Sequence, residues 1–251
     1  QVREVVAVSS PGERRGVAKI LRSGRPLELE KLALQTPGNC LSFTAMGLDA
    51  RGMLDQVLEL AKAMDPNAEQ QLAKEIEGVE QSMGLKLRED ILDPLGDVLT
   101  IESSVPDDGL LPETVVSIAV KDAAKVQATL TEVAKQAGFE IKSLDRGGRR
   151  ISYVQSPLGK LGDDPTRGMN QDQMAAQAFV LNLFSAWTID QGRISFASHP
   201  QALDERFERL QKGSLAEQEL FKRAVAQGPA GARMFAWTKT RPFAGVAYHV
   251  M

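Results

Sequence analysis

The sequence predicts an α+β fold in which an antiparallel sheet carries helices packed on one face. Short β-branched or apolar runs occur in pairs, joined by glycine-containing turns at residues 146–148 and 190–192, which is typical of hairpins. Between the pairs lie longer segments whose apolar residues recur every three or four positions, as they do on one side of a helix. Hairpin strands that alternate apolar and polar residues need helices on one face only.

The composition is that of a folded protein with a sizeable core. Of 251 residues, 43% are hydrophobic and 25% are charged, while aromatic residues make up only 5%, so the core must be mainly aliphatic. The net charge of −3 and the lack of a basic stripe argue against a nucleic-acid partner. No apolar run reaches the roughly 20 residues of a membrane helix, so we expect no transmembrane segment within this chain. An anchor outside it is compatible with the sequence.

The predicted elements follow from these patterns. Helices are expected at residues 49–63, 68–83 and 122–136, with a short helical turn at 88–92. The last helix begins at Asp122, a favourable cap, and we expect it to bury Ala124, Val126 or Leu130, and Val133 against the sheet. Strands are expected at residues 98–105, 114–120, 139–144, 150–155, 186–189 and 193–197.

The two ends of the chain resemble each other, which predicts an internal duplication. The matching pairs, in the same order along both ends, are Pro11 and Pro200, Gly24 and Gly213, Lys31 and Lys222, and Pro37 and Pro229. Each copy is expected to form a strand, two helices and a strand. Residues 1–36 would then end a preceding repeat, residues 37–228 form one complete period, and residues 229–251 begin the next, all packed as one or two globular units. We therefore expect both ends to be cut from a longer protein.

Neither histidine has an obvious catalytic partner. His199 precedes Pro200 at a strand-to-helix junction where only Asp204 is near in sequence, so we interpret it as a loop residue. His249 lies close to the end of the chain. The single cysteine, Cys40, is expected to be a buried, unreactive thiol.

An acidic set surrounds the turn at residues 92–96 and comprises Glu89, Asp90, Asp93 and Asp97. Paired carboxylates can perform acid–base chemistry or hold a divalent cation, but helix starts and tight turns also favour them. We prefer the structural interpretation, with Arg88 neutralising part of the charge. The acidic turns at residues 107–108 and 163–164 are interpreted in the same way.

The longest irregular stretch covers residues 156–173 and precedes an apolar run at residues 174–183 that could form a helix. Such a loop is either a functional lid or a surface insertion, and packing is the favoured interpretation. Neither a phosphate-binding glycine loop nor a nucleophile elbow occurs in the sequence. We therefore predict no catalytic, cofactor-binding or metal-ligating residues.

Four short motifs resemble a known family. They are residues 84–96 (GLKLREDILDPLG), a strand pair that ends at residues 120–122 (VKD), residues 190–195 (DQGRIS) and residues 213–216 (GSLA). In this order they resemble a large family of uncharacterised exported bacterial proteins, known only as a domain of unknown function. The insertion at residues 156–173 departs from the family pattern. The resemblance implies an exported or periplasmic location, often with an N-terminal anchor, and supplies no catalytic residues.

The function expected from these observations is that of a non-catalytic binding or structural module, whose partner is a protein or a component of the cell envelope. Two alternatives stay open. One is a hydrolase that uses carboxylates such as Asp90 and Asp93, with or without a metal ion. The other is a small-ligand carrier, for which a deep apolar cavity beneath residues 156–173 would be the sign. The sequence indicates no cofactor, and enzymatic activity is the less favoured hypothesis.

Overall fold

The computed structural model describes residues 24–65, 67–105, 112–136, 139–155 and 185–239. The strands are β1 (Ser42–Gly47), β2 (Leu95–Ser104), β3 (Glu113–Val120), β4 (Glu140–Arg146), β5 (Arg149–Gln155), β6 (Ala186–Asp190), β7 (Arg193–Ala197) and β8 (Met234–Thr238). The helices are α2 (Leu29–Leu34), α3 (Ala50–Met64), α4 (Ala68–Met83), the π-helical turn η1 (Leu87–Leu92), α5 (Ala123–Gln136), α7 (Pro200–Gln211), the 3₁₀ turn η3 (Leu215–Glu217) and α8 (Glu219–Ala226).

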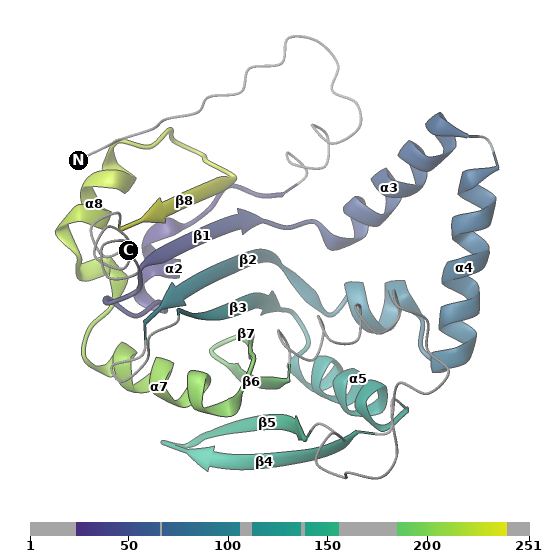
Figure 1. Cartoon of the computed structure of the whole chain (residues 1–251). Coiled ribbons are helices and arrows are strands. Elements are labelled where there is room, and N and C mark those ends of the chain that lie inside the picture. Colours follow the sequence, from purple (N-terminus) through teal and green to yellow (C-terminus); the bar gives the residue numbers. More distant parts are fainter. Residues whose placement is uncertain (1–23, 66, 106–111, 137–138, 156–184, 240–251) are drawn as a thin grey trace, which may run out of the picture.

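The strands of the described residues form one eight-stranded antiparallel sheet with the order β4-β5-β6-β7-β3-β2-β1-β8 (Figure 1). The predicted α+β class with an antiparallel sheet is therefore confirmed. Both predicted hairpin turns consist of two residues with positive φ, Gly147 and Gly148 in one and Gln191 and Gly192 in the other. Two successive positive φ angles match the right-handed twist of the flanking strands, which is why glycine occupies these turns.

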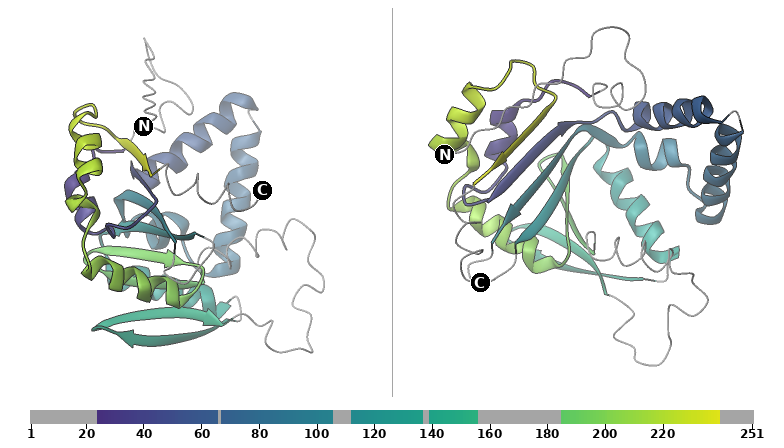
Figure 2. Two further views of the ribbon diagram at one scale, coloured as in Figure 1. Left: turned by 60° about the vertical axis from the view of Figure 1, so that its left-hand side comes forward. Right: turned by 45° about the horizontal axis from the view of Figure 1, so that its top comes forward.

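One face of the sheet is covered by α2, α7 and α8. Near β1 and β8 the core centres on Phe221 of α8, whose ring makes edge contacts with Phe43, Phe235 and Trp237 at centroid distances of 5.8, 5.7 and 5.9 Å. Towards β5 and β7, α7 supplies the core, mainly through the fully buried Leu203. These contacts place α7 and α8 on the same face of the sheet, with α8 near β1 and β8 and α7 towards β5 and β7 (Figure 2).

The opposite face is also covered in part, which corrects the expectation of helices on one face only. Val126 and Leu130 of α5 pack against Trp187 and Ile194 of β6 and β7. Residues next to these two along the same strands, such as Ala186, face α7 instead. Because β6 and β7 present apolar residues to both sides, each side needs a helix to exclude water.

The buried stripe of α5 differs in part from the prediction. Val126 is buried as expected, and Leu130 and Val133 are partly buried. Ala124 is exposed, so its assignment was wrong, and Ala134 is buried instead. Val126, Leu130 and Ala134 are spaced by four residues, which aligns them on the side of the helix that meets the sheet.

A buried polar layer lies between α7 and the centre of the sheet. Arg206 of α7 donates a hydrogen bond from Nε to Glu102 of β2 and another from Nη2 to the carbonyl oxygen of Gln35 at 2.6 Å. Arg193 of β7 donates from Nη2 to Oγ1 of Thr100 at 2.6 Å. Burial, and next the positive charge of Arg206, lower the pKa of Arg193 to about 10. Charged contacts as well as apolar ones therefore hold α7 on the sheet.

The duplication stays a prediction. The second copy does contain the expected order, with β7, α7, α8 and β8 in succession and η3 between the two helices. Residues 1–23 of the first copy lie outside the described residues, so only its α2 and β1 can be compared. β1 and β8 pair directly with each other in antiparallel orientation.

Within the described ranges, every helix is too short or too polar to cross a membrane.

Candidate binding surface on the α3–α4 hairpin

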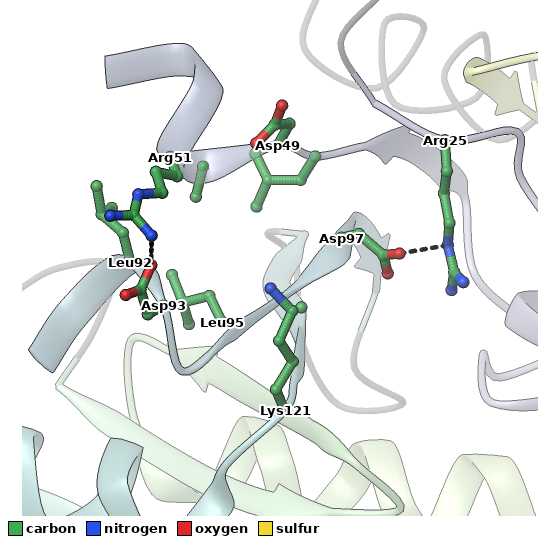
Figure 3. Close-up of a pocket in the computed structure, with 11 residues that line it drawn as sticks. Arg25, Asp49, Arg51, Leu92, Asp93, Leu95, Asp97 and Lys121 are labelled. Carbon is green, nitrogen blue, oxygen red and sulfur yellow. Dashed lines mark hydrogen bonds and ion pairs between the residues drawn. The ribbon is translucent and has the colours of Figure 1, made fainter. Parts of the chain in front are cut away.

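A shallow hollow of about 420 Å³ lies at the base of α3, next to the end of η1 and the start of β2 (Figure 3). Its lining consists of Arg25, Leu48, Asp49, Ala50, Arg51, Leu92, Asp93, Leu95, Gly96, Asp97 and Lys121. Three of these side chains are basic and three are acidic, so the hollow has no excess of either charge. Its apolar part is limited to a few leucines. The deep apolar cavity expected of a small-ligand carrier was predicted beneath residues 156–173, which lie outside the described residues.

The charges of the hollow are largely satisfied by one another. Nε of Arg25 lies 2.9 Å from Oδ2 of Asp97, and Nη1 of Arg51 lies 3.3 Å from Oδ1 of Asp93. Asp49 caps α3 by accepting the backbone N–H of Gly52 at 2.9 Å. The Arg51 pair ties the base of α3 to the end of η1, and the Arg25 pair ties the segment before α2 to the start of β2, so both have a structural role.

The remaining members of the acidic set have separate partners. Glu89 pairs with Lys86 at 3.3 Å, and Asp90 pairs with Nζ of Lys125 on α5 at 3.1 Å. The backbone N–H of Lys86, followed by Lys125, holds the pKa of Asp90 below its ordinary value. Arg88 does not neutralise this set as expected, because it pairs at 2.7 Å with Asp55 of α3. Each of the four carboxylates thus pairs with a different basic side chain. Among the described residues no group of three or more side chains could hold a metal ion.

His199 is the N-cap of α7. Its Nδ1 accepts the backbone N–H of Ala202 at 3.1 Å, and its Nε2 lies 3.3 Å from Oε1 of Glu113. Asp204, the neighbour considered from the sequence, pairs instead with Arg146 at 3.4 Å. Sequence reasoning missed Glu113 because β3 reaches this junction only through the pairing of β3 with β7. Both nitrogens of the imidazole are used, so a structural role accounts for this residue.

Cys40 is completely buried just before β1. Burial, and next the negative charge of Glu102, raise the pKa of its thiol to about 12. The thiolate needed for nucleophilic chemistry is therefore strongly disfavoured, as the sequence led us to expect. Several other candidates lie outside the described residues, namely His249, residues 107–108, residues 163–164 and the segment 156–183.

The hairpin formed by α3 and α4 extends away from the sheet (Figure 1). Both helices carry an apolar stripe, at positions 53, 57, 60 and 64 of α3 and 72, 76, 79 and 83 of α4. The helices contact each other, yet neither has a single buried residue. Val57, Val79 and Met64 are exposed by 43%, 55% and 80%. Two helices alone leave these stripes partly open to water.

The base of the hairpin is anchored, whereas its tip lies away from the sheet. Glu80 accepts the backbone N–H of Leu87 at 2.8 Å, and η1 is in turn held by α5 through the hydroxyl of Thr129, which donates to the carbonyl of Asp90 at 3.0 Å. Farther out, Lys62 and Glu69 join the two helices at 3.0 Å. The apolar stripes therefore lie on two helices whose base is held in place by contacts with η1 and α5.

Comparison of the chain with protein-family models, with curated proteins and with solved structures gave no match.

Proposed function

We propose that this chain is a non-catalytic binding or structural module of an exported or envelope-associated protein, and that the α3–α4 hairpin is its partner-binding surface. The observation that carries the proposal is the exposure of Val57, Met64 and Val79 on stripes that span both helices. Neither α3 nor α4 contributes a buried side chain, so ordering these helices costs conformational entropy without adding to the core. Contiguous apolar residues on a projecting element are typical of protein-contact surfaces.

The chemistry of the remaining candidates supports the same proposal. Each carboxylate of the acidic set has its own basic partner, His199 caps a helix, and the Cys40 thiol is buried. Catalytic groups usually share a cleft with partners that orient them and shift their pKa. These residues are instead distributed over separate structural roles, so the hydrolase alternative has no specific observation in its favour.

The location outside the cytoplasm follows from the family resemblance of the sequence motifs and forms part of the proposal. It can be tested by fusing the full-length protein to a reporter that is active only after export. Activity of the reporter in the cytoplasm alone would contradict this part.

The binding role can be tested by photocrosslinking in cells that produce the full-length protein. A photoreactive residue replaces Val79 on α4, and a matched control replaces the exposed Ser143 on β4, at the distal edge of the sheet. We expect discrete crosslinked products at position 79 that are absent at position 143. Equal or absent crosslinking at both positions in folded protein would contradict the proposal, as would divalent-metal-dependent turnover that Asp90→Asn and Asp93→Asn abolish.

A further inference from the structure

Resting on the proposed function, we infer that the partner of the α3–α4 hairpin is a basic amphipathic helix of another protein. The first reason is the helical character of the surface. The exposed apolar residues lie on two helices that contact each other, and an amphipathic helix can lay its apolar face on such a surface. α3 has 15 residues and α4 has 16, so each is about 22–24 Å long and would match a partner helix of about four turns.

The second reason is the distribution of apolar residues. The open stripes include Val57 and Met64, seven positions apart on α3, and Val79 on α4. Met64 lies at the last position of α3 and is the most exposed of the three, so the uncovered surface extends to the outer end of that helix. A partner must therefore present apolar residues over several turns.

The third reason is charge. Residues 50–83 contain seven acidic and three basic side chains, a net charge of −4, whereas the whole chain carries −3. The negative charge of the protein is thus concentrated on the hairpin. Like charges on a partner would repel it, and basic flanks would complement it.

Glu75 on α4 provides a specific contact, and Glu77 adds negative charge from the other side of the helix. Among the described residues neither Glu75 nor Glu77 has a basic partner, and each accepts only a neutral glutamine amide, from Gln71 at 3.3 Å and from Gln81 at 3.2 Å. Glu75 lies four positions before Val79, on the same side of the helix. Lysine or arginine beside the apolar face of a partner helix would pair with Glu75.

Other occupants fit these observations less well. A second copy of the chain would bring two hairpins of charge −4 together. The apolar run at residues 174–183 contains no basic residue. Residues 11–23 are basic, but their large apolar residues span only positions 17–21, which is too short for stripes of eleven positions or more.

The test uses the full chain and three labelled peptides of sixteen residues, the length of α4. The first has leucine at i, i+3, i+4 and i+7 positions and lysine on the flanks. The second has glutamate in place of lysine, and the third has the lysine peptide's composition in scrambled order. Binding is followed by fluorescence anisotropy at low and at physiological salt.

We expect the amphipathic lysine peptide to bind about tenfold more tightly than either of the others, with an affinity that falls as salt is added. Replacing both carboxylates, Glu75→Lys and Glu77→Lys, should weaken the lysine peptide about tenfold and strengthen the glutamate peptide. Val79→Ser should weaken both amphipathic peptides, whereas Glu140→Gln on β4 serves as a control without effect. An unchanged urea midpoint confirms that each variant is folded.

Equal affinity for the three peptides, or no reversal by the charge-exchange variant, would overturn the inference. So would crosslinks from position 79 that form only with residues 11–23 or 174–183 of the same molecule, or only with a second copy. Failure of the lysine peptide while position 79 still crosslinks to another protein would overturn this inference and leave the proposed function in place. Absence of any crosslink at position 79 would overturn both.

Discussion

Removing the charge of Glu102 should destabilise the protein more than removing the charge of Arg206, although the two form one ion pair. The side chain of Glu102 is 3% exposed and that of Arg206 is 8% exposed, so neither is well solvated. Arg193 completes the cluster with a second buried guanidinium. The cluster therefore contains two positive charges and one negative charge.

The expected magnitudes follow from this imbalance. Glu102→Gln leaves two buried cations without a counter-charge, and removing one partner from a buried pair costs about 3–5 kcal/mol. Arg206→Met leaves Glu102 and Arg193, a cluster without net charge, and its cost is the loss of the hydrogen bonds to Glu102 and to the carbonyl of Gln35, together about 2–4 kcal/mol. We thus expect Glu102→Gln to be the more harmful substitution.

Urea unfolding followed by tryptophan fluorescence is a suitable assay, since Trp187 is buried in the sheet. With a urea dependence of roughly 3 kcal/mol per M, the midpoint of Glu102→Gln should fall by about 1–1.7 M. Glu140→Gln on the exposed face of β4 is the matched control and should stay within about 0.5 kcal/mol of the parent. Equal losses for Glu102→Gln and Arg206→Met, or a larger loss for Arg206→Met, would refute the reasoning from charge balance.

Three further predictions concern single residues. The Cys40 thiol should not react with Ellman's reagent until the chain unfolds. Because its folded pKa of about 12 exceeds the ordinary thiol pKa of 9.0, the free energy of unfolding should fall as pH rises between these values, and it should fall less in Cys40→Ala. Because the pKa of Asp90 is depressed, its carboxylate stabilises the fold above the ordinary aspartate pKa, and this stabilisation is lost on acidification. The acid-induced fall in the free energy of unfolding should therefore be smaller in Asp90→Asn. An identical pH dependence of the two proteins would contradict this. Gly96→Ala should cost about 1–3 kcal/mol in urea unfolding, because the new Cβ would lie 2.5 Å from that of Ala119. In the control Gly78→Ala on α4, the new Cβ meets nothing within 4 Å, so this variant should be more stable than the parent by up to about 1 kcal/mol. Equal effects of the two substitutions would count against the packing argument.

Local signals in the sequence account for the elements that were predicted well. α4 begins and ends where the periodicity indicated, and Gly84 terminates it with a φ of +58°. The N-cap at Asp49 and the glycine turns of the two hairpins are likewise set by neighbours within four residues. Such features depend on backbone conformation and helical spacing, which a single segment specifies by itself.

The features that were not predicted depend on residues distant in sequence. Glu102 and Arg206 are 104 positions apart, and His199 meets Glu113 only because β3 and β7 are neighbours in the sheet. The placement of α5 on the second face follows from the strand order, which crosses from β7 to β3. Likewise, the sequence indicated both apolar stripes of the α3–α4 hairpin, but whether a third layer covers them depends on tertiary structure.

The two faces of β2 illustrate the same limit and permit a direct test. Alternation along this strand would bury Ile101 and expose Glu102, yet Ile101 is 38% exposed and Glu102 is buried. The side with Glu102 faces α7, where Arg206 supplies a partner, whereas the apolar cluster beneath α5 on the opposite side includes Leu95 of β2 but not Ile101.

Ile101→Ala should therefore cost about 1 kcal/mol or less, because much of the side chain already contacts water. The same substitution at Ile194, which is fully buried beneath α5, should cost about 2–5 kcal/mol. Urea midpoints of the two variants measure the difference with identical chemistry at both positions. Comparable losses at both positions would mean that Ile101 is covered in solution, and the open face of β2 would then have to be reassigned as part of the core.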